Sequence, residues 1–143
     1  MFLVHNRHRL TTKGGFFILT NYGLVGMIFI NLALVIYTIG VWSERIQGRL
    51  KWWHVGMFYS GLVCDTIGTG AMTIMAAGLF QFNFHGITGL AAILIMLFHA
   101  GWATLVLKNK NEVRIVKFHK FSILVWFIWL IPMVTGAIFG ATI

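Results

Sequence analysis

Four histidines lie within or beside long apolar segments, where an ionisable side chain needs a function or a partner. His85 and His99 are 14 residues apart. On a helix this is close to four turns, so both rings project from one face, about 21 Å apart along the axis. Imidazole nitrogens are common metal ligands, and histidine is a usual axial ligand of haem iron. The spacing therefore predicts a membrane helix that presents imidazoles for haem iron at two depths.

His54 and His119 lie at the starts of two other apolar segments, next to basic residues. If four helices follow one another round a square bundle, the second and fourth face each other across a diagonal of roughly 14 Å when neighbouring axes are about 10 Å apart. A porphyrin between two imidazoles needs this wider gap. We therefore predict that His54 and His119 hold one non-covalent haem b. Two alternatives stay open: His99 replaces His54, or His85 belongs to a second haem site.

Asp65 is the acidic residue in the middle of an apolar segment, 11 residues after His54 and so on the same helical face. We favour a hydrogen bond from Asp65 to a ligating imidazole, as carboxylates make at metal sites. A proton relay, a cation site and a bond to a neighbouring helix are the alternatives. The corresponding functions are a quinone-linked membrane oxidoreductase and a small proton-coupled transporter, which would require a homodimer. A haem-binding or electron-transfer protein is favoured over an enzyme.

The elements that must position these residues follow from composition. Hydrophobic residues make up 59% of the 143-residue chain and charged residues 10%, whereas soluble domains carry about a quarter charged residues. A helix needs about 20 apolar residues to cross a membrane, and the apolar segments supply four such stretches, the middle two separated at 81–83. The sequence predicts an all-α integral membrane bundle with up-down topology: a polar extension over 1–15, then one domain over 16–143 with helices near 16–43, 51–80, 84–108 and 112–141.

Basic residues set the predicted orientation. The net charge is +8, and most of the Lys and Arg residues lie in two loops that this topology brings to one side: Arg45, Arg49, Lys51, Lys108, Lys110, Arg114, Lys117 and Lys120. Loops rich in Lys and Arg remain cytoplasmic. We therefore expect both termini on the non-cytoplasmic side of the cell membrane. Basic residues confined to such loops favour anionic lipid headgroups as partners over nucleic acid.

A more particular resemblance rests on six short blocks. These are residues 37–44 (YTIGVWSE), 50–54 (LKWWH), 64–69 (CDTIGT), 84–89 (FHGITG), 98–100 (FHA) and 118–122 (FHKFS). In combination they resemble the HsmA (haem-sensing membrane protein A) family of small four-helix membrane proteins, from about residue 22 to the end of the chain. The resemblance implies haem binding and a part in haem handling or oxidative-stress protection. It does not assign the ligands, the number of haems or a redox partner.

Overall fold

The described residues form four helices. The computed structural model describes the backbone of residues 2–75 and 84–141. The helices are α1 (Phe2–Gln47), α2 (Trp52–Met75), α3 (Phe84–Asn109) and α4 (Glu112–Ala141). The predicted all-α fold is confirmed for these residues, while the predicted end of the second helix at 80 and the turn at 81–83 lie outside them.

The first helix is longer than predicted, and the two described connections have clear local causes. α1 begins at Phe2 instead of near residue 16, because the polar segment ahead of the apolar stretch contains no proline to stop a helix. After α1, Gly48 adopts a left-handed φ of 60° and its N–H donates to the carbonyl of Arg45, a common way to end a helix. Before α4, the Asn111 side chain accepts the N–H groups of Val113 and Arg114 and so caps the helix.

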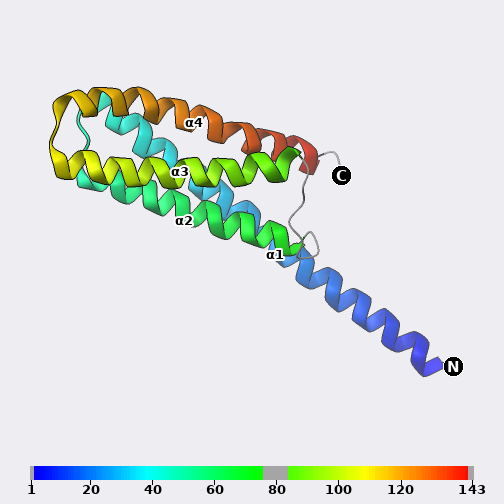
Figure 1. The fold of residues 1–143 in the computed structure, drawn as a ribbon. Helices are drawn as coiled ribbons and strands as arrows, with labels where there is room; N and C mark the ends of the chain where they lie inside the picture. The colour runs from blue at the N-terminus through cyan, green and yellow to red at the C-terminus, as the bar shows by residue number, and fades with distance from the viewer. Residues whose placement is uncertain (1, 76–83, 142–143) are drawn as a thin grey trace.

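The helices are arranged as a square in chain order. α1 packs against α2 and α4, and α3 packs against the same two helices; among the described residues, α1 and α3 make no close backbone contact, nor do α2 and α4. The α1–α2 and α3–α4 connections lie at the same end, and the first part of α1 extends beyond the other helices at the opposite end (Figure 1). The predicted diagonal between the second and fourth helices is therefore present.

Glycines bring α1 and α2 into close contact. A Cβ added to Gly68 would lie 2.6 Å from Cγ1 of Ile30, 3.0 Å from its backbone nitrogen and 3.1 Å from the carbonyl oxygen of Gly26. Two of these three atoms belong to the backbone of α1 and cannot move aside without moving the helix. Small residues that let backbones approach are the usual means of packing helices in lipid.

We expect Gly68→Leu to destabilise the bundle by about 1–3 kcal/mol, since a larger side chain forces α1 away from α2. The measurement is the free energy of unfolding in mixed micelles titrated with a denaturing detergent. Gly70→Leu is the matched control, because a Cβ on Gly70 would meet open space. Equal losses in the two variants would contradict this account of the α1–α2 contact.

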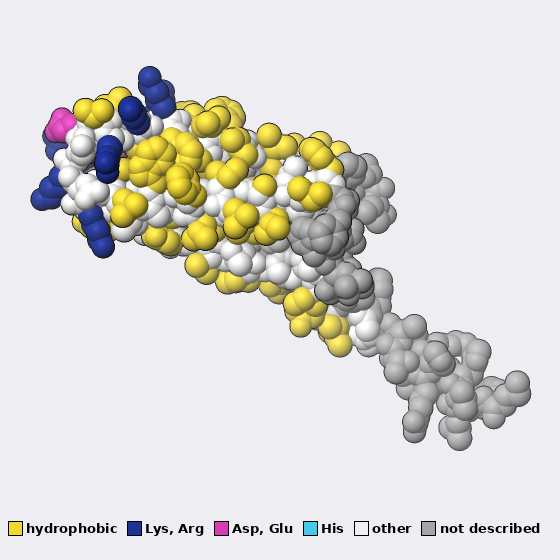
Figure 2. Space-filling view, in the orientation of Figure 1, with side chains coloured by type: hydrophobic (Ala, Val, Ile, Leu, Met, Phe, Trp, Pro, Cys, Tyr) yellow, Lys and Arg dark blue, Asp and Glu magenta, His cyan; other side chains and the backbone are white. Residues whose placement is uncertain are grey.

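Three helical segments are long and apolar enough to cross a membrane: Thr20–Gln47, Phe84–Asn109 and Glu112–Ile138. The described residues of α2 are less apolar than these three segments. His54, Asp65 and several Ser, Thr and Gly residues lower the mean hydropathy of α2. Large apolar side chains cover the visible outer face of the bundle (Figure 2), and Phe98 and Phe127 are among those that point outward, 61% and 56% exposed. Such a surface suits lipid and not water.

Candidate functional site

A polar contact joins α1 and α4 near the loop end of the bundle. His119 Nδ1 bonds to Oε1 of Glu44. Glu44 is fully buried, whereas the His119 side chain is 17% exposed. Metal-ligating histidines characteristically bond their second ring nitrogen to a carboxylate or carbonyl, which fixes the ring and directs the other nitrogen at the metal. This contact therefore leaves Nε2 of His119 as the nitrogen available to a metal.

His54 is held by the start of its own helix. Its Nδ1 accepts the backbone N–H of Lys51 at 2.9 Å, the position from which Glu or Gln closes a capping box. A neutral ring that accepts at Nδ1 carries its proton on Nε2. That Nε2 is fully buried and has no hydrogen-bond partner among the described residues. Leaving such a group without a partner costs about 1–3 kcal/mol of folding free energy. His54 therefore both caps α2 and carries a buried polar atom that no described residue satisfies.

His54 and His119 lie near the loop end of the bundle, on the two helices of the α2–α4 diagonal. The two helices make no close backbone contact within the described residues, so only side chains meet across this diagonal. One turn further along α2, Phe58 packs against Phe118 of α4 across the same diagonal, with the two ring centroids 6.3 Å apart. Packed aromatic side chains therefore fill the diagonal on the inner side of the two histidines.

His99 has a different environment from the other candidates. Its Nδ1 bonds to the Tyr37 hydroxyl at 2.7 Å and its Nε2 to Ser122 Oγ at 2.9 Å. Phe118 stacks on the ring at 4.9 Å with an interplanar angle of 9°. The contacts with Ser122 and Phe118 place His99 at about the level of His119 on α4. However, both of its nitrogens are engaged, so His99 has no lone pair free for a metal in this arrangement.

His85 lies far from this group, near the opposite end of α3. It is exposed and sits over Gly136 of α4, where an added Cβ would lie 2.6 Å from its Cε1. The described residues contain no cluster of three or more His, Cys, Asp or Glu side chains that could hold a metal ion. The structure thus places His54 and His119 at the same end of the bundle, packs His99 against Phe118 and Ser122 of α4 as a hydrogen-bonded core residue, and leaves His85 apart.

Asp65 bonds to a tryptophan and not to the histidine that sequence reasoning favoured. Its Oδ2 accepts Nε1–H of Trp129 at 3.3 Å across the α2–α4 diagonal. A bond from Asp65 to a neighbouring helix was one of the predicted alternatives; the bond observed reaches the helix across the diagonal instead. The carboxylate that contacts an imidazole is Glu44. Sequence reasoning missed Glu44 because this residue ends an apolar segment beside basic residues, where an acidic side chain is usually solvated. The signal that could have pointed to Glu44 is that it is a single acidic residue among basic ones.

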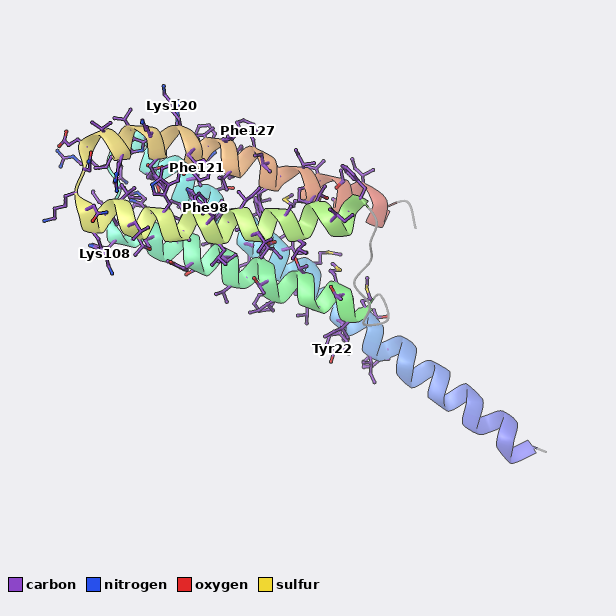
Figure 3. All side chains as sticks on the ribbon, viewed as in Figure 1. Tyr22, Phe98, Lys108, Lys120, Phe121 and Phe127 are labelled. Carbon is purple, nitrogen blue, oxygen red and sulfur yellow. The ribbon has the colours of Figure 1, made fainter. Side chains whose placement is uncertain are left out.

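The loop end is strongly basic. Lys and Arg side chains gather around the two connections (Figure 2), and Lys108 and Lys120 point away from the helices there (Figure 3). Lys51 lies in the α1–α2 connection, next to the cap of His54. Cationic side chains in this number attract carboxylates and phosphates. His54 and His119 therefore lie at the end of the bundle that is best suited to an anionic ligand.

Comparisons with protein-family models, with curated proteins and with solved structures found no match to this chain. The interpretation of the site therefore rests on its own residues and geometry.

Proposed function

We propose that this chain is a multi-pass membrane protein that binds one b-type haem at the basic end of its bundle, with His119 as the first iron ligand. The contact between Glu44 and His119 carries this proposal. A carboxylate in this position fixes the ring, raises the basicity of the other nitrogen and leaves Nε2 free to ligate, as at known metal sites. Haem held in this way supplies reversible one-electron chemistry, and the role we assign is haem sequestration within the membrane.

His54 is the proposed second ligand, and the weaker one. Its buried Nε2 needs a partner, and it lies across the diagonal from His119. Ligation through Nε2 requires that nitrogen to lose its proton, and protonation at Nδ1 would oppose the Lys51 N–H that now bonds there. His54 must therefore give up its capping bond in order to bind iron. We assign no ligand role to His99, whose nitrogens are both bonded, or to His85.

The basic loops support the same location. Haem carries two propionate carboxylates, and Lys and Arg bind carboxylates. Arg45 lies in the last turn of α1, Lys51 lies just before α2, and Lys120 lies on α4 near its start. We propose that these loops are cytoplasmic, that α2 crosses the membrane with the other three helices, and that both termini lie on the non-cytoplasmic side. We also propose membership of the HsmA family.

The test is an absorption spectrum of the full-length chain, purified in detergent and titrated with haemin. We expect a Soret band that saturates near one haem per chain and sharp α and β bands on reduction. Because His54 is the weaker ligand, His54→Ala should keep the haem and lose the sharp low-spin bands. A folded protein that takes up no haemin, or one whose spectrum is unchanged in His54→Ala, would contradict the assignment of ligands.

A further inference from the structure

An amide side chain lies on the outer face of α1, in the middle of an apolar segment that is long enough to cross a membrane. Asn31 is exposed, 11 residues after the start of Thr20–Gln47 and 16 residues before its end. At about 1.5 Å per residue these separations are about 16 and 24 Å, whereas half of the hydrocarbon layer is about 15 Å thick. Asn31 therefore faces the interior of the bilayer and not the headgroups.

The Asn31 amide is only partly satisfied by its own helix. Among the described residues it makes one hydrogen bond, in which Nδ2 donates to the Met27 carbonyl at 2.8 Å. An amide carries two N–H donors and an oxygen that accepts, so one N–H and Oδ1 have no partner in that part of the chain. Polar groups in hydrocarbon find no water to bond to and are costly when left unsatisfied. This position therefore needs a partner that brings both a donor and an acceptor.

The side of α1 that carries Asn31 is uncovered at this depth. α1 contacts α2 through a stripe that includes the buried Gly26 and Gly40. At 3.6 residues per turn, Asn31 lies about 140° and 180° round the helix from these two glycines. Nearer the loops α4 covers part of the Asn31 side, where Trp126 donates to Thr38 at 3.0 Å. From Asn31 towards the start of the helix, this side of α1 is exposed.

Apolar side chains continue the exposed surface on both sides of Asn31. Leu24, Ile28 and Val35 are 53%, 63% and 54% exposed, and together with Asn31 they follow one another in steps of four, three and four residues. We call these four positions the α1 seam. Two helices pack along such a spacing in a left-handed supercoil, and an Asn at one position of the seam fixes their register. A shallow hollow of about 440 Å³ lies at the centre, lined by Met27, Ile28, Asn31, Leu32 and Val35.

We propose that the α1 seam docks on the same seam of a second copy of this chain, with the two Asn31 amides bonded to each other. All copies are inserted in one orientation, so a twofold axis along the membrane normal brings each seam residue to its own counterpart. The remaining N–H of each amide donates to Oδ1 of the other, which satisfies both side chains. A different membrane helix would have to offer a matching polar group, whereas a second copy supplies one by symmetry.

The first test is sedimentation equilibrium of the full-length chain, without haemin, in density-matched micelles. We expect a reversible dimer whose dissociation constant rises about fivefold to tenfold in Asn31→Leu, which corresponds to about 1–1.4 kcal/mol for the pair of interhelical hydrogen bonds. Thr66→Leu is the matched control. It also replaces an exposed polar side chain in a helix of the bundle, but the Thr66 hydroxyl donates to the Leu62 carbonyl of its own helix. Its dissociation constant should equal that of the unmodified chain.

The second test is oxidative cross-linking in lipid vesicles, which locates the interface. With Cys64→Ser as the background, Ile28→Cys and Val35→Cys should each yield a disulfide-linked dimer, because both positions lie on the α1 seam. Leu94→Cys, at a position of α3 that is 57% exposed, should yield none.

Three results would overturn the proposal. They are a monomer at every protein concentration, equal dissociation constants in Asn31→Leu and Thr66→Leu, or cross-links at Leu94 with none on the α1 seam. A monomer would leave the seam to a different membrane protein or to lipid. Because haemin is absent from both experiments, a failure of haem binding does not change their outcome.

Discussion

Replacing His119 by alanine is expected to abolish the Soret band of the haemin-titrated protein. The substitution removes the ring that Glu44 orients, together with the nitrogen that we assign to the iron. The loss in haem affinity should exceed the roughly 10–100-fold that removal of an outer partner of a metal ligand costs. The measurement is a titration with haemin followed by absorbance, with the folded state checked by circular dichroism.

His85→Ala is the matched control for this prediction. It also removes an imidazole from the bundle, but from an exposed position over Gly136 and away from Glu44. Its haem affinity should equal that of the unmodified chain. If His119→Ala kept its haem while His85→Ala lost it, the ligand would lie at the opposite end, and the Glu44–His119 contact would be a structural ion pair.

The helices and their square order could be predicted from the sequence because both depend on simple constraints. Long apolar segments must satisfy their backbone hydrogen bonds internally, so they form helices. Short connections between them favour neighbouring helices packed in chain order. These predictions needed only lengths and the rise per residue.

The ring partners could not be predicted in the same way, because they depend on how each helix is rotated about its axis. In a soluble bundle the polar face marks the outside. Here lipid and core are both apolar, so the pattern of hydrophobic residues does not distinguish the two sides of a helix. The inward position of Tyr37 and Ser122 therefore remained hidden. Both are ordinary residues in a membrane helix unless a partner across the bundle is known.

The same ambiguity explains why Asp65 was favoured over Glu44 as the partner of an imidazole. Asp65 lies in mid-helix, and its position on the face of His54 was the visible signal. Three turns separate them along α2, however, so the two side chains lie at different levels of the bundle. Glu44 lies on another helix, 75 positions away from His119. Pairings at that separation depend on the depth of each helix end, which the loop residues set only approximately.

His99→Leu should separate the stability of the core from the binding of haem. The substitution keeps an apolar side chain at a buried position but removes two hydrogen bonds, and Tyr37 and Ser122 each lose a partner. At about 0.5–1.5 kcal/mol per bond, we expect the free energy of unfolding in micelles to fall by about 1–3 kcal/mol. The haem spectrum of the folded protein should be unchanged, because the iron ligands lie on α2 and α4. Loss of haem with unchanged stability would instead make His99 a ligand, as one sequence alternative held, and would displace His54 from the site.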